Sequence, residues 1–250
     1  MVRKKTPNLE ELRSLPPFTL LEEKKEEKKK KKKWQNPHKR EYGIEIVERV
    51  NEKRDLGEPE HKVSIDIGYT TSGLTHWDIL NRKVKSLYYK KNEQSLVKGA
   101  GIVYLTKLCE ETYQKYLEIL PEEVRQKVQV TQFILEEPLV IAGQKSFSIS
   151  LYVLLHYLIT KLLYDFDCHS IVLVRPGSAK KLLNWGRSKM PDGEKTKWIK
   201  EHLPEWETKN NHTADSNFSM ILTNYEKLKE LYPSIALLNK VDYQIYRSYL

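Results

Sequence analysis

Four side chains that can bind a metal ion stand at the ends of predicted secondary-structure elements. Asp66 lies in KVSIDIGYTTSG (62–73), where apolar and polar residues alternate as in a strand with one buried face. Aspartate is depleted in strands and is rarely buried without a partner, so its presence there calls for an explanation. Glu136 lies near the end of a second such segment, KVQVTQFILEEP, and His212 and Asp215 lie in HTAD.

These residues predict metal-assisted phosphoryl chemistry. An open sheet places its active groups at the carboxyl ends of its central strands, so Asp66 and Glu136 converge if their strands are neighbours. His212 and Asp215 are three residues apart on the first turn of the predicted final helix, and they share one face. Converging acids repel one another unless a cation lies between them, and oxygen ligands suit Mg²⁺ or Mn²⁺. Two such ions about 3.5–4 Å apart stabilise the attacking and leaving oxygens of an in-line displacement.

The elements that must position these residues follow from hydrophobic periodicity. The order is three strands, a helix, a strand, a helix, a strand and a final helix that opens at Asn210–Asn211 and carries an apolar stripe as far as Tyr232. The strands are expected at 62–68, 72–79, 83–91, 127–138 and 170–174, and the two long helices at 96–119 and 146–164. Right-handed crossovers place the last two strands parallel to the first. The sequence therefore predicts an α/β fold whose mixed five-stranded sheet, with three antiparallel strands and then two parallel ones, is flanked by helices.

Composition and charge narrow the class of partner. The chain has 250 residues and a formal net charge of +9, which indicates either an anionic partner, with nucleic acid the first candidate, or simply a basic soluble protein. Residues 1–60 form a Lys/Glu-rich extension that we expect to be disordered, and residues 61–250 the globular domain. Lys28–Lys33 fits a nuclear-localisation signal, a nucleic-acid-binding arm or a solvated tail. Only two cysteines and no signal peptide favour an intracellular location, and the apolar segment 146–164 is expected to be a core helix rather than a membrane span.

Together these motifs resemble the RuvC-type Holliday junction resolvases, which have the RNase H-like nuclease fold. DIG at the end of the first strand, ILEEP at the end of the fourth and HTAD at the start of the last helix carry the resemblance over about 62–232. The wording SIDIG is most similar to the resolvases of poxviruses, other large DNA viruses and mitochondria. The resemblance implies a catalytic tetrad of Asp66, Glu136, Asp215 and His212, the last at a position where some members have Asp. Glu137 follows Glu136 where relatives often carry Gln, and we favour Glu136 as the ligand.

The resemblance also implies partners. It implies a homodimer that cuts two strands of a four-way DNA junction symmetrically during recombination, repair or replication and leaves ligatable nicks. The basic segment 175–189 could clamp phosphates or be a solvated loop, and Tyr69 and Thr70 could contact the DNA backbone. In the family a lysine near this segment approaches the site, and Lys180 or Lys181 is the candidate. The DNA-binding residues expected from this segment are Arg175, Lys180, Lys181, Arg187 and Lys189.

Three other functions stay open at this stage. DIGYTTSG resembles the phosphate-binding hairpin of sugar-kinase and Hsp70-like ATPases, but these need two duplicated domains and a second such hairpin. Another nuclease of the RNase H-like fold, such as one that cleaves RNA–DNA hybrids, has the same acids. A non-catalytic nucleic-acid-binding protein of this fold is disfavoured, because uncompensated buried acids are a liability. The leading prediction is a Mg²⁺-dependent endonuclease, a phosphodiester hydrolase acting on branched DNA.

Overall fold

A single mixed sheet forms the centre of the domain in the computed structural model. The structure describes residues 43–48, 58–90, 102–126, 131–138, 145–166, 168, 170–175, 177–185, 190–242 and 244–249. Its strands are β1 (Gly43–Glu48), β2 (His61–Asp66), β3 (Thr71–Asp78), β4 (Lys83–Lys90), β5 (Thr131–Glu136), β6 (Ser170–Val174) and β7 (Gln244–Tyr249). Hydrogen bonds join them in the order β4-β3-β2-β5-β6-β1-β7.

The five central strands confirm the predicted fold class. β2, β3 and β4 form the antiparallel meander, and β5 and β6 follow as parallel strands beside β2. The register sets Ile65 of β2 level with Leu135 of β5. Because both strands run in the same direction, their carboxyl ends lie at the same edge of the sheet.

The predicted strand number of five is wrong, because β1 and β7 extend the sheet to seven strands. β1 pairs antiparallel with β6 and parallel with β7, and Arg247 Nη1 lies 2.7 Å from Glu48 Oε1 between the two strands. β1 falls within residues 1–60, which we expected to be a disordered extension. A six-residue segment between highly charged stretches has little periodicity to reveal it, and pairing with a distant strand decides its structure.

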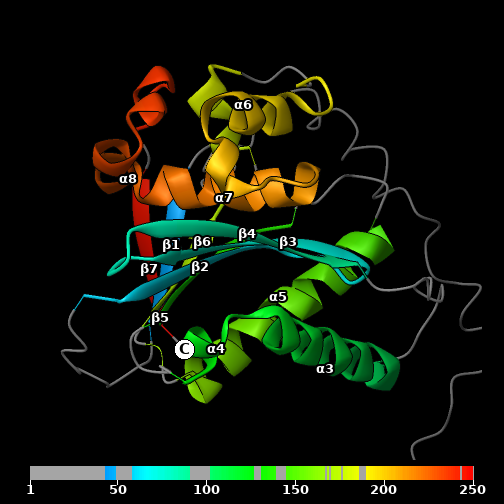
Figure 1. The fold of residues 1–250 in the computed structure, drawn as a ribbon. Helices are drawn as coiled ribbons and strands as arrows, with labels where there is room; N and C mark the ends of the chain where they lie inside the picture. Colours follow the sequence, from blue (N-terminus) through cyan, green and yellow to red (C-terminus); the bar gives the residue numbers. More distant parts are fainter. Residues whose placement is uncertain are drawn as a thin grey trace, which may run out of the picture. The chain divides into compact units, whose positions relative to one another are not determined.

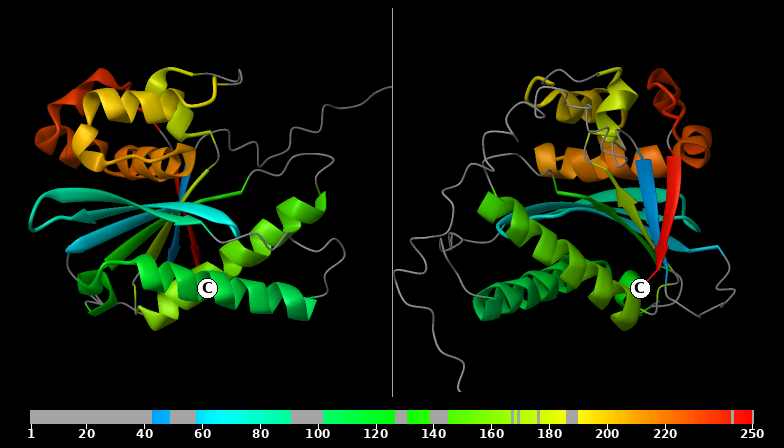
Figure 2. Two further views of the ribbon diagram at one scale, coloured as in Figure 1. Left: turned by 45° about the vertical axis from the view of Figure 1, so that its right-hand side comes forward. Right: turned by 180° about the vertical axis from the view of Figure 1, so that it is seen from behind.

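Helices cover both faces of the sheet (Figures 1 and 2). One face is covered by α3 (Ile102–Ile119), α4 (Glu122–Gln126) and α5 (Lys145–Asp165). The other face is covered by α6 (Glu194–His202), α7 (Asn211–Thr223) and α8 (Tyr225–Leu231). Short 3-10 helices span η3 (Ala179–Leu183), η4 (Pro204–Trp206) and η5 (Pro233–Leu237).

Each face has its own hydrophobic core, because neighbouring residues of a strand point to opposite faces. Val63, Ile65 and Leu135 pack on the side of α3 and α5, whereas Ile134 packs on the side of α6 and α7. Asp66 lies two residues after Ser64, and Glu136 lies two residues after Ile134, so both acids point toward α7. This alternation decides which helices can complete a site with Asp66 and Glu136.

Two helices refine the predictions. α5 is the apolar helix that we expected, and it contributes Leu154, Leu158 and Leu162 to the core. Within the described part of the chain, no helix combines the length and apolarity needed to cross a bilayer. The predicted final helix ends at Thr223, and a separate helix, α8, begins at Tyr225.

Candidate active site

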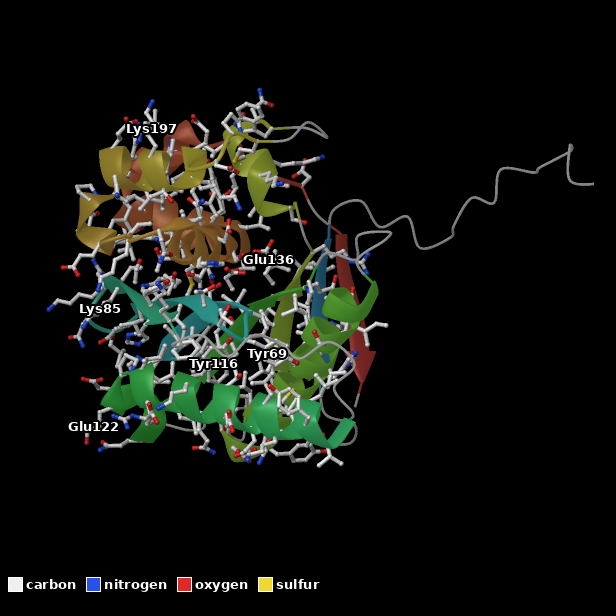
Figure 3. All side chains as sticks on the ribbon, turned by 90° about the vertical axis from the view of Figure 1, so that its right-hand side faces the viewer. Tyr69, Lys85, Tyr116, Glu122, Glu136 and Lys197 are labelled. Carbon is white, nitrogen blue, oxygen red and sulfur yellow. The ribbon has the colours of Figure 1, made fainter. Side chains whose placement is uncertain are left out.

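Asp66 and Glu136 come together because β2 and β5 are adjacent and parallel. Ile65 is level with Leu135, so the next residue of each strand is one of the two acids. Both acids point toward the face covered by α6 and α7, and Figure 3 shows Glu136 between the sheet and α7. Glu137 points elsewhere, with its Oε2 atom 3.8 Å from Arg175 Nε. The geometry therefore favours Glu136 over Glu137 as the site residue.

Gly73 allows the start of α7 to approach the sheet. It pairs with Asp66 across β2 and β3. A Cβ atom at Gly73 would lie 2.1 Å from both the carbonyl carbon and the oxygen of His212, and 2.3 Å from Thr213 N. The backbone of α7 therefore rests directly on β3 at this point. Only glycine permits this contact, and it places HTAD beside Asp66.

A capping box fixes the start of α7. Asn210 is the N-cap, as predicted; its side chain accepts a hydrogen bond from Thr213 N, and the Thr213 hydroxyl accepts one from Asn210 N. Further along, Asn217 is buried and contacts Thr75 of β3 and Ser86 of β4 through its side-chain oxygen. These short polar side chains hold α7 close to the sheet and set the positions of His212 and Asp215.

His212 contacts Asp66 directly. Its Nδ1 lies 2.7 Å from Asp66 Oδ2, and its Nε2 lies 2.9 Å from Thr71 Oγ1. The hydrogen bond to Asp66 raises the pKa of His212. The pKa of Asp66 is also raised, mainly by burial and further by the charge of Asp215, although the hydrogen bond with His212 opposes this. The imidazole thus orients the Asp66 carboxylate in this structure.

Lys195 of α6 is a site residue that the sequence analysis missed. Its Nζ forms an ion pair with Asp215 Oδ1, and its side chain is 12% exposed. Burial lowers the pKa of Lys195, but the charges of Asp215, Glu136 and Asp66 outweigh burial and raise it. The ammonium also lies 6.0 Å from the centre of the Phe218 ring. One lysine therefore interacts with all three predicted acids.

Glu136 is the acid whose negative charge is least compensated by neighbouring protein groups. Burial raises its pKa to about 8; Lys195 opposes this, and the charges of Asp215 and Asp66 add to it. Among the described residues, no hydrogen-bond or ion-pair partner of the Glu136 side chain is found. A partly buried carboxyl group close to two other acids stays protonated near neutral pH unless a cation joins it. This unsatisfied group fits an oxygen-liganded divalent ion.

The predicted metal cluster is not preassembled. Among the residues that the structure describes, no three His, Cys, Asp or Glu side chains are arranged to hold an ion. The reason lies in the contacts above: Asp66 is bonded to His212, and Asp215 is paired with Lys195. The oxygen donors of these residues suit Mg²⁺ or Mn²⁺, but Asp66 and Asp215 both have protein partners in this structure.

Tyr69 does not have the expected role at a DNA surface. It is 3% exposed, and its hydroxyl donates a 2.5 Å hydrogen bond to the Ser150 carbonyl of α5. Figure 3 shows Tyr69 and Tyr116 on the opposite side of the sheet from Glu136. Past Gly68 the chain turns, so that closeness to Asp66 in sequence does not bring Tyr69 into the site. Thr70 is exposed, and its contact with DNA stays a prediction.

Tyr116 of α3 supports the hairpin that carries Asp66. Its hydroxyl lies 2.6 Å from Ser72 Oγ and donates a 3.0 Å hydrogen bond to the Gly68 carbonyl. Ser72 Oγ in turn accepts a 3.0 Å hydrogen bond from Gly68 N. These contacts tie the two ends of the turn between β2 and β3 to a helix and make it rigid.

The predicted basic residues are only partly near the acids. Lys180 of η3 lowers the pKa of Glu136 through its charge, and it lines a cleft of about 140 Å³ together with Lys195 and Asp215. Arg175 lies by Glu137, and Lys181 is half-buried on η3. Arg187, Lys189 and the lysine run 28–33 lie outside the described residues.

A larger cavity of about 660 Å³ lies away from the acids, where β2 and β5 begin. Lys62 and Gln132, near the starts of these strands, line it together with Asn224. Lys62 Nζ donates a 2.6 Å hydrogen bond to Asn224 Oδ1. Because an open sheet gathers its reactive groups at the carboxyl ends of its strands, the smaller cleft beside Asp215 is the candidate active site.

The sequence gives only a weak indication that Lys195 belongs to the site. It lies in a helix, α6, that carries several lysines, so that no single one stands out. Ile199, one turn later, is completely buried, so Lys195 shares the side of α6 that faces the protein. Lysine is almost never buried without a partner. A lysine on the apolar face of a helix therefore predicts an acidic partner, although not which one.

Comparisons with known proteins show similarity to a solved structure at low sequence identity. No family model matches the chain, and no curated protein matches it. Among solved structures, the chain is similar to T. thermophilus RuvC in complex with a Holliday junction substrate, at 14% identity and a TM-score of 0.45. The similar region covers 67% of this chain and 95% of that one.

Proposed function

We propose that this protein is a divalent-metal-dependent endonuclease that resolves four-way DNA junctions by paired phosphodiester hydrolysis. One observation carries the proposal: Asp66, Glu136 and Asp215 come from three separate elements, yet they lie close enough for the charge of Asp215 to raise the pKa of both Asp66 and Glu136. Gathering three partly buried acids is costly, and metal-ion chemistry is the use that compensates for the cost.

The residues have distinct roles in this proposal. Asp66, Glu136 and Asp215 would hold the ions, and we expect two of them at the site. When bound, the ions supply charge neutralisation at the phosphate and an activated water. His212 orients Asp66 through Nδ1, and it would have to give up a present hydrogen bond to become a ligand itself. Lys180, at the wall of the cleft, is placed to attract a DNA phosphate.

A substrate panel tests the proposal. The protein is incubated with labelled four-way junction, linear duplex or RNA–DNA hybrid, with Mg²⁺ or with EDTA. We expect Mg²⁺-dependent cutting of the junction, and Asp66→Asn and Asp215→Asn variants that bind the junction without cutting it. Asp78→Asn is the matched control, because Asp78 lies at the opposite end of the β2–β3 ladder, level with His61. Equal cutting of all three substrates would refute junction specificity, and hybrid cutting alone would favour the other RNase H-like nuclease.

Paired cutting also predicts a dimer. A four-way junction has two symmetric cleavage points, and a closed twofold assembly presents two equivalent active sites to them. Light scattering should give twice the mass of 29.6 kDa. A purely monomeric protein that cuts only one strand would contradict this part of the proposal.

A further inference from the structure

The ion pair between Lys195 and Asp215 lies inside the candidate metal site. Lys195 is 12% exposed and Asp215 is 31% exposed on their side chains, so water screens the pair only in part. The same ammonium lies over the ring of Phe218, which is one turn after Asp215 on α7. Lys195 also acts electrostatically on Glu136 and Asp66. The ammonium group of Lys195 therefore compensates part of the negative charge of the three acids.

The charge of Lys195 and its contact with Oδ1 disfavour a bound ion on Asp215. A lysine ammonium within bonding distance of a carboxylate oxygen occupies that oxygen, and it repels a divalent ion that approaches the same group. Neutralising the acids with Lys195 also stabilises the fold before an ion arrives. The absence of a preassembled ligand group among the described side chains follows from these contacts.

We propose that Lys195 is an internal counter-ion of the metal site, which pairs with Asp215 in the metal-free protein and must leave it when a divalent cation binds. This inference rests on the proposed function, because it assumes that the acids bind an ion. It makes Lys195 a positioning residue that sets the affinity of the site for the ion. The pair and the bound ion exclude one another.

The cleft offers the displaced side chain somewhere to go. Asp192, three residues before Lys195, and Asn211, at the start of α7, both line the cleft of about 140 Å³ that also contains Lys195 and Asp215. A four-carbon stem allows the ammonium to move within this cleft without any movement of α6. Once released from Asp215 the side chain becomes more exposed, which gives a direct way to detect the exchange.

The test measures ion binding without DNA. Mn²⁺ affinity is determined by electron paramagnetic resonance for the wild-type protein, Glu136→Gln, Lys195→Met, Lys195→Arg and Lys197→Met. Lys197 is the matched control, because it is exposed on the same helix and Figure 3 shows it on the outer side of α6. We expect Lys195→Met to bind Mn²⁺ about tenfold more tightly, since about 1.4 kcal/mol of competing ion-pair energy is removed. Lys195→Arg and Lys197→Met should bind like the wild type.

A second readout needs no variant that might unfold. An amine-reactive reagent is applied to the wild-type protein with and without Mg²⁺, and the labelling of each lysine is followed by mass spectrometry. Labelling of Lys195 should increase several-fold with Mg²⁺, while that of Lys62 and Lys197 should not change.

The outcomes separate this inference from the proposed function. If Glu136→Gln weakens Mn²⁺ binding but Lys195→Met binds like the wild type, and Lys195 labelling is unaffected by Mg²⁺, the acids bind an ion and the counter-ion role is wrong. If no variant binds Mn²⁺, the proposed metal-dependent function fails, and this inference fails with it.

Discussion

Gly73→Ala should separate Asp66 from the residues of α7. Asp66 and Gly73 face one another across β2 and β3, and the backbone of His212 lies against Gly73. The added Cβ would lie 2.1 Å from His212 C and O, where an ordinary contact begins at 3.4 Å. The clash is with backbone, which cannot rotate away as a flexible side chain can. The start of α7 must therefore move.

The size of the effect follows from this distance. α7 has to retreat by at least about 1.3 Å to restore an ordinary contact. Overpacking of this kind costs about 1–3 kcal/mol, which corresponds to roughly 2–12 °C in the melting temperature of a domain of this size. A misplacement of about 1 Å at reacting groups costs about 100-fold in rate. We therefore expect a moderately destabilised protein with junction cleavage reduced by about two orders of magnitude.

Two measurements distinguish displacement of the site from general instability. Thermal unfolding gives the loss of stability, and NMR titration of His212 reports on its contact with Asp66. In the wild-type protein that hydrogen bond raises the pKa of His212, so in Gly73→Ala the pKa should fall back toward the ordinary histidine value of 6.5. Gly177→Ala is the matched control: its Cβ meets nothing within 4 Å, and its positive φ of 83° costs only about 1 kcal/mol.

A specific result would refute this reasoning. If Gly73→Ala is folded, cuts junctions at the wild-type rate and keeps the raised pKa of His212, then α7 does not depend on a bare backbone at this position. The same cleavage loss in Gly177→Ala would show that any small change reduces activity.

Three further predictions concern stability. The pKa of Glu136 is raised to about 8, so the metal-free protein loses stability as the pH rises from 4.5 to about 8. In denaturant titrations, Glu136→Gln should therefore stabilise the protein by about 1–3 kcal/mol at pH 8 and by very little at pH 5. Burial lowers the pKa of Lys62 to about 8, so the charged side chain reduces stability below pH 8, and this loss becomes smaller toward pH 10.5. Between pH 7 and 10 the free energy of unfolding of the wild type should rise by about 2 kcal/mol relative to that of Lys62→Met. A stability difference between wild type and variant that does not change with pH would mean that the group concerned is solvated in the folded protein. Tyr116→Phe removes the hydrogen bonds to Ser72 and Gly68 and should cost about 1–2 kcal/mol in thermal unfolding, whereas no loss would mean that the hairpin is rigid without them.

The central fold could be predicted because its strands have strong local patterns. Alternating apolar residues in β2 and a continuous apolar run in β6 indicate strands before any tertiary contact is considered. β1 and β7 could not be predicted in the same way. Their pairing joins segments about 200 residues apart, and nothing in either short segment specifies the other.

The candidate site was predictable only where strand and helix periods determine direction. Asp66, Glu136, His212 and Asp215 could be assigned because a strand end or a helix start fixes where each side chain points. Tyr69 was misplaced because the turn after Gly68 ends that regularity, and the ring enters the core between α3 and α5.

Lys195 and Gly73 explain why the acids alone did not reveal the geometry of the site. Gly73 contributes by having no side chain, and its meaning appears only when the backbone of His212 is seen against it. Lys195 contributes a charge from a helix whose place over the sheet depends on tertiary packing.

The distribution of counter-charges suggests how stability and function are divided among the acids. Asp66 is hydrogen-bonded to His212 and Asp215 is paired with Lys195, so each of these two acids has a protein partner. The carboxyl group of Glu136 remains protonated near neutral pH, because burial and the charges of Asp215 and Asp66 disfavour its ionised form. Binding of a divalent ion must therefore remove a proton from Glu136 as well as displace Lys195. Ion affinity should accordingly rise with pH up to about 8 in the wild type and lose this dependence in Glu136→Gln.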